Sequence, residues 1–137
     1  MPTTSTAYAM FGVCSTELSP QEIGAHLGLT PSKAYVMGTP TGKSKPATHP
    51  HHHALFHSRH GPCDDMVKLI IDVLDLVEPL KPKLELIADR CTSTVHCNYV
   101  VNVEGGWELS PALLERMSSL GVSFLFSLDE HSKTNTT

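Results

Sequence analysis

The chain has 137 residues, and 10 lysine and arginine residues against 14 aspartate and glutamate residues leave a formal charge of −4 at neutral pH. Its length and its 40% hydrophobic content predict one domain with a modest core, since domains commonly take about 100–200 residues. Its mild acidity argues against nucleic-acid binding, which needs clustered Lys and Arg. The longest apolar stretch, Leu69 to Val77, is interrupted by two aspartates and is far shorter than the roughly 20 residues of a membrane-spanning helix.

The first third of the chain predicts two strands around one helix. Ala7 to Cys14 is an apolar and aromatic run, typical of a buried strand. Ser19 predicts the start of a helix, because it can cap free backbone amides, a proline follows it, and Glu22 can complete a capping box. Gly28 ends this helix, and Lys33 to Met37 is a weaker strand candidate.

The middle of the chain predicts a loop, a strand and two helices. Gly38 to Pro50 is rich in Gly, Pro, Thr, Ser and Lys, which indicates a surface loop. His53 to Arg59 alternates with period two, which indicates a third strand. Asp64 and Asp65 place acids at the positive end of the longest predicted helix, which continues at helical spacing to Val77. Pro79 bends or ends it, and a short helix is predicted over Lys83 to Asp89.

The last third predicts a strand, a helix and a strand. Cys91 to Val103 alternates and indicates a half-buried strand with a polar side. Ser110 begins a helix that Gly121 ends, and Val122 to Asp129 alternates again, with one strongly apolar face. The predicted domain therefore covers residues 7–130, between a disordered N-terminus at 1–6 and a frayed tail at 131–137.

A short repeat organises these elements. The tetrad Glu17 to Pro20 recurs as Glu108 to Pro111, each time after a strand and before a short helix that closes in Leu-Gly. The repeat predicts two pseudo-duplicated β-α-β units. The alternative is that Ser-Pro and Leu-Gly recur only because they are common at the starts and ends of helices. Together the elements predict an α+β domain in the order β-α-β-β-α-β-α-β, with a mixed five-stranded sheet and helices on one face.

These segments resemble a mostly bacterial family, the domain of unknown function 4279. The resemblance covers roughly Ala7 to Asp129 and rests on the order of Leu18 to Ile23, Leu27 to Leu29, Gly38 to Pro40, Leu76 to Pro79, Leu109 to Leu114 and Leu120 to Phe124. The family often has a tryptophan in the third strand, where this chain has Phe56 and a histidine cluster. The resemblance implies an α+β fold without known catalysis, and an immunity role beside bacterial toxins, which is suspected for several relatives.

Histidine is the most unusual feature of the composition, because six of the nine histidines lie between His49 and His60. Imidazole is the commonest transition-metal ligand, so His51, His53 and His57 are candidate ligands for weakly bound Zn, Ni or Cu. On a strand rising roughly 3.3 Å per residue, His53 and His57 stand about 13 Å apart. We therefore expect a solvated surface here, with weak metal binding or a pH-responsive patch as alternatives and no other cofactor.

Catalytic motifs are absent from the sequence. Cys63, Cys14 or a serine beside a histidine would be the candidate nucleophiles, but the chain has no nucleophile elbow, no phosphate-binding glycine loop and no His-Glu-x-x-His segment. We expect a protein without catalysis. The alternative is a small metal-binding module or enzyme that uses the His51, His53 and His57 face.

The polar side of the predicted sheet is the candidate surface for a protein partner, with plain solvent exposure as the alternative. Trp107 is either a core plug or a partner anchor, and Asp64 and Asp65, with Asp129 and Glu130, can complement a basic partner. The predicted partner-binding residues are His57, Arg59, Asp64, Asp65, His96, Asn98 and Trp107.

The predicted function is therefore the binding of another protein, and more narrowly an immunity-type inhibitor that neutralises a toxin. A second copy of the chain, paired along the edge strand Lys33 to Met37, is an alternative partner. Because the N-terminus lacks the basic start and apolar run of a secretory signal, we expect a cytoplasmic protein that binds neither membranes nor nucleic acid.

Overall fold

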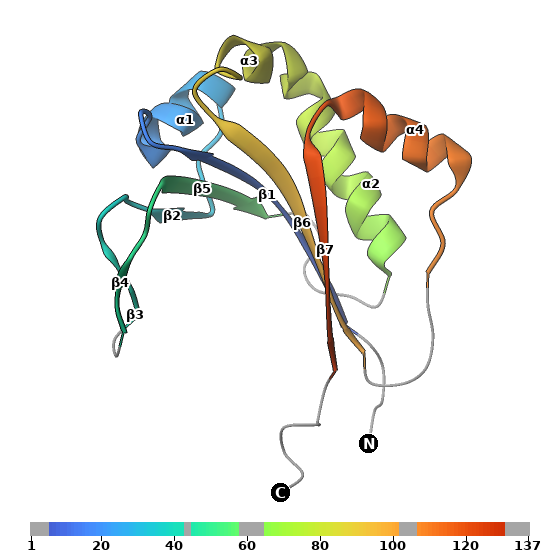
Figure 1. Ribbon diagram of the computed structural model, residues 1–137. Coiled ribbons are helices and arrows are strands. Elements are labelled where there is room, and N and C mark those ends of the chain that lie inside the picture. Colours follow the sequence, from blue (N-terminus) through green and yellow to red (C-terminus); the bar gives the residue numbers. More distant parts are fainter. Residues whose placement is uncertain (1–5, 43–44, 58–64, 102–106, 131–137) are drawn as a thin grey trace, which may run out of the picture.

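The computed structural model describes residues 6–42, 45–57, 65–101 and 107–130. Its main sheet contains β1 (Thr6–Ser15), β2 (Lys33–Tyr35), β5 (His52–His57), β6 (Thr92–Val101) and β7 (Ser123–Glu130), in the spatial order β2-β5-β1-β6-β7. The helical segments are α1 (Pro20–Leu27), α2 (Met66–Val77), the 3₁₀ helix η1 (Glu78–Leu80), α3 (Lys81–Leu86) and α4 (Pro111–Leu120). The helices gather on one face of the sheet, and the described helices leave the opposite face open (Figure 1).

The predicted α+β class and mixed five-stranded sheet are confirmed. β1 pairs antiparallel with β5 and β6, β2 pairs antiparallel with β5, and β6 pairs parallel with β7. The unit β6-α4-β7 thus joins two neighbouring parallel strands. The unit β1-α1-β2 also joins strands that run in the same direction, but β5 lies between them. The two copies of the tetrad repeat therefore introduce related units of which only one is contiguous in the sheet.

The expected loop between Gly38 and Pro50 is partly wrong, because this segment forms a β-hairpin. Its strands are β3 (Pro40–Gly42) and β4 (Lys45–Thr48), and they form a separate two-stranded sheet. The base of the hairpin is closed by hydrogen bonds from the Gly38 amide to the His49 carbonyl (2.9 Å) and from the His49 amide to the Thr39 carbonyl (2.8 Å). Pairing through the backbone needs no apolar side chains, so composition alone did not reveal it.

The predicted caps of α1 and α4 are confirmed in their hydrogen bonds. The Ser19 hydroxyl accepts from the Glu22 amide (3.1 Å), and the Glu22 carboxylate accepts from the Ser19 amide (2.9 Å), which completes a capping box. The Ser110 hydroxyl accepts from the Leu113 amide at 3.1 Å. Leucine has no side-chain acceptor, so the second cap lacks the reciprocal bond.

This difference predicts unequal costs for removing the two caps. Ser19→Ala is expected to lower the free energy of unfolding by about 1–2 kcal/mol and Ser110→Ala by about 0.5–1 kcal/mol. The first change removes the hydroxyl bond and also loosens the reciprocal bond from the residue 19 amide, which alanine retains, to the Glu22 carboxylate. Urea unfolding of both variants measures the difference, with Ser119→Ala in the exposed part of α4 as the control, expected within about 0.5 kcal/mol of the parent. A larger loss for Ser110→Ala would contradict the argument.

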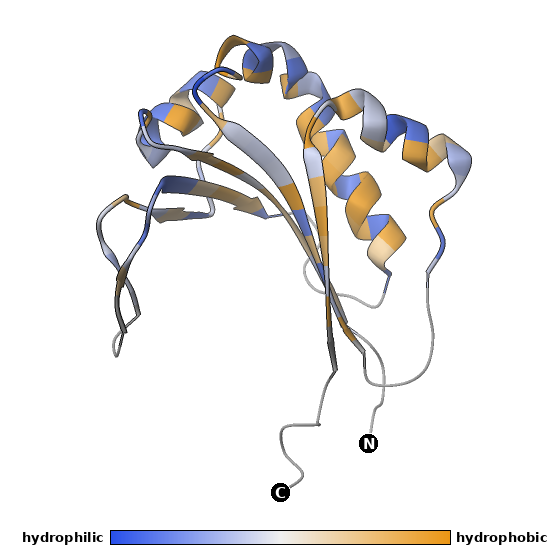
Figure 2. Cartoon of the chain, in the orientation of Figure 1, coloured by the Kyte–Doolittle hydropathy of each residue, from blue (hydrophilic) through white to orange (hydrophobic). Residues whose placement is uncertain are grey.

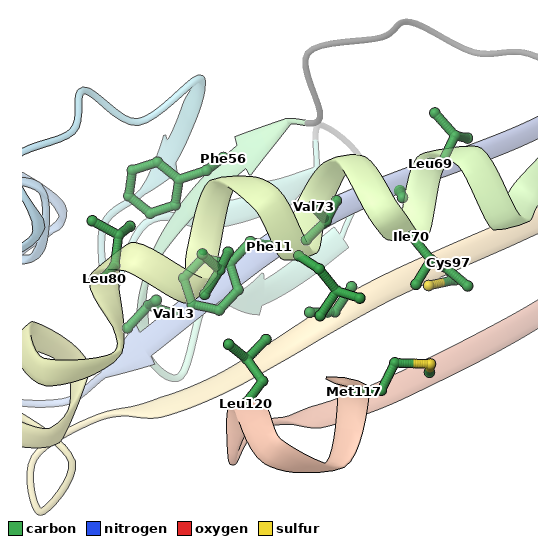
Figure 3. Packing of buried hydrophobic residues seen from close by; sticks show 14 of the residues in the cluster. Phe11, Val13, Phe56, Leu69, Ile70, Val73, Leu80, Cys97, Met117 and Leu120 are labelled. Atoms are coloured by element: carbon green, nitrogen blue, oxygen red, sulfur yellow. The ribbon is translucent and has the colours of Figure 1, made fainter. Parts of the chain in front are cut away.

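The core lies between the helices and the covered face of the sheet. α2 carries mostly hydrophobic residues with few hydrophilic positions (Figure 2). Figure 3 shows Phe11 and Val13 of β1 together with Ile70 and Val73 of α2 in this layer, and all four are fully buried. In the described part of the chain, no helix combines the length and apolar character needed to cross a lipid bilayer.

Arg116 ties α4 to α2 at the edge of this core. Its guanidinium donates to both carboxylate oxygens of Glu78 (3.0 and 2.8 Å) and to the Asp75 carboxylate (2.9 Å). These two acids raise the pKa of Arg116 further above its ordinary value. The ion pairs are largely exposed, so they orient α4 more than they stabilise the fold.

Candidate functional site

The open face of the sheet contains a hollow of about 330 Å³, close to the lower end of the roughly 300–1,000 Å³ that small-molecule sites occupy. Imidazoles from three segments line it, and we call it the imidazole pocket after His49, His53 and His96. Tyr35 of β2 lies beside two of them. Because the pocket is built from separate parts of the chain, its shape depends on the tertiary fold.

Strand pairing places the other lining residues in order along the pocket. Leu55 lies two residues after His53 on β5, and Met10 lies on the neighbouring strand β1, two residues before the Gly12 that pairs with Leu55; both line the hollow. At the far end Tyr8 lies opposite Asn98, which lies opposite Ser127 of β7. The pocket therefore has an apolar middle between a ring-lined end and an end with amide and hydroxyl groups.

Gly12 of the central strand allows two lining side chains to meet across β1. A Cβ atom at this position would lie 3.1 Å from Leu55 Cδ2 and 3.2 Å from His96 Nε2. These distances are tighter than ordinary van der Waals contact, so a side chain at Gly12 would push against both groups. The glycine thus shapes the pocket without presenting any functional group of its own.

Ring contacts connect the wall of the imidazole pocket from β2 to β6. The ring centroids of Tyr35 and His49 lie 4.7 Å apart, those of Tyr35 and His53 lie 6.5 Å apart, and those of His53 and His96 lie 6.4 Å apart. The hydrogen bonds at the hairpin base hold the His49 backbone in place. The result is a row of flat rings along one side of the hollow.

Burial and repulsion between imidazoles favour the neutral form of His53, and burial favours the neutral form of His96. Burial lowers the pKa of His53 below its ordinary value, and the charges that His96, His51 and His49 would carry lower it further. Burial alone lowers the pKa of His96. Burial also raises the pKa of the Cys97 thiol to about 12. A neutral imidazole has one N–H donor and one acceptor nitrogen, so His53 and His96 can offer hydrogen bonds to the pocket without a net charge.

These pKa shifts predict that acid destabilises the fold. The unfolded chain takes up protons at the ordinary histidine pKa of about 6.5, whereas folded His53 and His96 take them up only at lower pH. The contribution of these two neutral imidazoles to the free energy of unfolding is therefore fully present above that pKa and is lost as pH decreases below it. His53→Gln should reduce the loss in melting temperature between pH 7.5 and pH 5.5, and His57→Gln, on the same strand, should leave that loss unchanged. An equal pH response in parent and His53→Gln would contradict the assignment.

The structure brings some of the predicted site residues together. His96 and Asn98 line the imidazole pocket with His53, one of the candidate metal ligands. His57 lies on the same face opposite Met10, but it is exposed and does not line the pocket. His51 lines a different hollow of about 320 Å³, which it shares with Cys14 and Cys91 among others.

The remaining predicted residues lie elsewhere. The Asp65 carboxylate accepts from the Lys68 amide (3.1 Å) and caps α2 on the helix side of the sheet. Trp107 packs against the core, with its ring 6.0 Å from that of Tyr99 and 5.4 Å from that of Phe126. Arg59 and Asp64, and the Asp129 and Glu130 side chains, lie outside the described residues.

No group of three His, Cys, Asp or Glu side chains in the described residues is arranged to hold a metal ion. His51, His53 and His57 accordingly do not form one ligand set in this part of the structure. The separation of His53 and His57 along β5 is the geometric obstacle that the strand rise predicts.

Sequence reasoning missed several lining residues. Tyr8 and Met10 share the parity of Gly12 along β1, so the two faces of that strand were separable in principle. The nearly continuous apolar run instead indicated a strand buried on both faces. Tyr35 and His49 carry no local signal, because only the pairing of β2 with β5 and the hairpin base place them beside His53.

The comparisons with known proteins agree with the resemblance in the sequence. No curated protein and no solved structure matches the chain. The family model described as domain of unknown function DUF4279 matches residues 4–131. Since this match spans the whole described structure, the chain belongs to the DUF4279 family.

Proposed function

We propose that this protein is a non-catalytic binding domain that holds another protein against the open face of its sheet. The observation that carries the proposal is the imidazole pocket together with the exposed apolar side chains next to it. Tyr8 at the polar end is 42% exposed, and Leu125 of β7, opposite His96, is 52% exposed. Aromatic and apolar groups around a hollow are typical of the centre of a protein interface.

Of the four acids expected to complement a basic partner, only Asp65 has a described side chain. Asp65 caps a helix on the covered side of the sheet, away from the imidazole pocket. The proposed contact therefore depends on shape, apolar burial and hydrogen bonds to neutral imidazoles, with His96 and Asn98 as the predicted residues that belong to it.

The family resemblance supports a narrower proposal, in which the partner is a bacterial toxin and the protein acts as its immunity-type inhibitor. In that case the open face would cover the active surface of the toxin. The support for this step is the suspected role of several relatives, whereas the support for protein binding is the surface itself.

Site-specific photocrosslinking tests the proposed face. A photoreactive amino acid is placed at Tyr8 or Leu125 on the open face, or at Leu114 of α4, which is 47% exposed on the helix side. In cells of the native source, we expect one discrete adduct from the two open-face positions and none from Leu114. Adducts from Leu114 alone, or from none of the positions, would contradict the proposal.

A charge substitution then tests whether the captured partner depends on this face. Leu125→Asp should weaken its binding about tenfold or more, since 1.4 kcal/mol corresponds to a factor of ten. Leu114→Asp is the matched control because it places the same charge at a similarly exposed leucine. Equal affinity of both variants for the partner would show that the interface does not lie on the open face.

A further inference from the structure

The imidazole pocket has the chemistry of a small-ligand site. We propose that it binds a small organic acid that consists of a flat apolar body with one carboxylate. The chain would bind this ligand without any protein partner, so the proposal goes beyond the proposed protein binding. Three features of the described residues support it: the charge of the lining, its shape and its response to protons.

The lining of the imidazole pocket contains no Asp, Glu, Lys or Arg among the described residues. The titratable groups that face His53 and His96 from the neighbouring elements are Tyr8 of β1, Tyr35 of β2, Cys97 of β6, Cys14 opposite His53, His49 at the hairpin base, and His51. Burial raises the thiol pKa of Cys14 and Cys97, and none of the other groups is a carboxylate. None of these groups supplies a negative charge to a protonated imidazole at neutral pH.

The same face carries further basic side chains around the pocket. Lys33 of β2 lies opposite Leu55, and His57 lies opposite Met10. Together with the three imidazoles, these groups favour an anion over a cation. An anionic carboxylate accepts charge-assisted hydrogen bonds from imidazolium N–H groups, and these bonds are roughly twice as strong as neutral ones.

The shape of the pocket favours a flat ligand body. The Tyr35 ring lies between two imidazoles along one wall, and its centroid is 4.7 Å from that of His49 and 6.5 Å from that of His53. Met10 and Leu55 supply the apolar middle. Planar groups gain from offset or edge contacts with such rings, and a hollow of about 330 Å³ accommodates a single small ring system.

Ligand binding in this pocket is coupled to protonation. In the empty pocket, burial and neighbouring histidines oppose the charged form of His53, and burial opposes that of His96. A bound carboxylate favours the charged form and raises the imidazole pKa. Binding therefore takes up a proton, and affinity increases as pH falls, by up to about tenfold per pH unit for one proton. A bound cation would show the opposite dependence, and a neutral ring would show none.

The experiment uses benzoate as the probe and benzamide as its uncharged isostere. Each is titrated into the full chain at pH 8, 7 and 6 by calorimetry, with NMR of the histidine resonances to locate binding. We expect benzoate to bind at the imidazole pocket and to tighten at least about threefold from pH 8 to pH 6, whereas any benzamide binding stays constant. Lack of benzoate binding, equal binding of both probes, or pH-independent benzoate affinity would overturn the proposal.

Histidine variants assign the effect to residues. His53→Gln and His96→Gln should each weaken benzoate binding at pH 6 about tenfold and flatten its pH dependence, because glutamine keeps a polar side chain but cannot become charged. His26→Gln, at an exposed position of α1 on the helix side of the sheet, is the control and should retain both. Folding of each variant is checked by its NMR spectrum. Unchanged pH dependence in both pocket variants would contradict the assignment.

Competition separates the two sources of such a carboxylate. If benzoate added before irradiation prevents the crosslink to the partner, an acidic group of that partner occupies the imidazole pocket. If benzoate binds while the partner stays bound, the pocket serves a free organic acid, as proposed. Loss of the crosslink in the presence of benzoate would show that the pocket binds a carboxylate of the partner, and this would overturn the proposal of a free organic acid. Failure of crosslinking overturns only the proposed function, because benzoate binding is measured without any partner.

Discussion

Phe11→Ala is expected to lower the free energy of unfolding by about 3–5 kcal/mol, the range for a large-to-small change in a closed core. Phe11 is fully buried in β1, the central strand of the sheet, and its ring centroid lies 6.1 Å from that of Phe56. α2 covers it from above, so neighbouring groups have little freedom to fill the cavity (Figure 3). Natural domains have a net stability of about 5–15 kcal/mol, so this loss would be a large share of the total.

Urea unfolding measures the effect, with Phe126→Ala as the matched control. Phe126 lies on β7, the edge strand, and is 38% exposed. Its removal should therefore cost less than half as much as removal of Phe11, because less apolar area is returned to water. Similar losses for the two phenylalanines would show that β1 is not the centre of the core.

Gly24→Ala is expected to destabilise the protein by about 1–3 kcal/mol, the typical cost of overpacking. Inside a helix this substitution normally stabilises by about 1 kcal/mol, because alanine has the higher helix propensity. Here the added Cβ would lie 2.6 Å from the Leu29 carbonyl oxygen and 3.1 Å from Pro31 Cδ. The clash with a backbone atom exceeds the gain in propensity, and the sign of the effect reverses.

The surrounding backbone has little freedom to relieve this clash. The Leu29 amide donates to the Gly24 carbonyl at 3.0 Å, which holds the chain after α1 against the helix. Gly28 at the end of α1 has a φ of 73°, so the turn between them is fixed as well. Thermal unfolding of Gly24→Ala, compared with the exposed Gln21→Ala in the same helix, measures the sign. A melting temperature above that of the parent would refute the steric argument.

Sequence reasoning succeeded where the structural cause is local. The serine caps, the left-handed glycines after α1 and α4, and the Asp65 cap of α2 depend on hydrogen bonds between residues no more than a few positions apart. The alternation of β6 identified His96 and Asn98 on one side of the strand, because successive side chains point to opposite faces. The open-face position of these two residues was therefore predictable before their neighbours were known.

The same reasoning did not reach the contacts between distant segments. The β3–β4 hairpin lacks an apolar pattern, and Trp107 carried two open interpretations until the structure placed it against Tyr99 and Phe126. The metal candidates were adjacent in the sequence, yet His51 and His53 line different hollows. Nearness along the chain is a poor guide to nearness on a strand, where each residue advances roughly 3.3 Å.

The sequence by itself therefore determined the helices and the five strands of the main sheet to within a few residues, and the family, because caps, periodicity and turn residues act over short distances. Only the tertiary structure decided that β5 lies between β1 and β2 and that the rings of Tyr35, His49, His53 and His96 come together on the open face. Strand order and register follow from burial of one face against the helices, a property of the whole chain. The imidazole pocket is a product of that order, and no single segment encodes it.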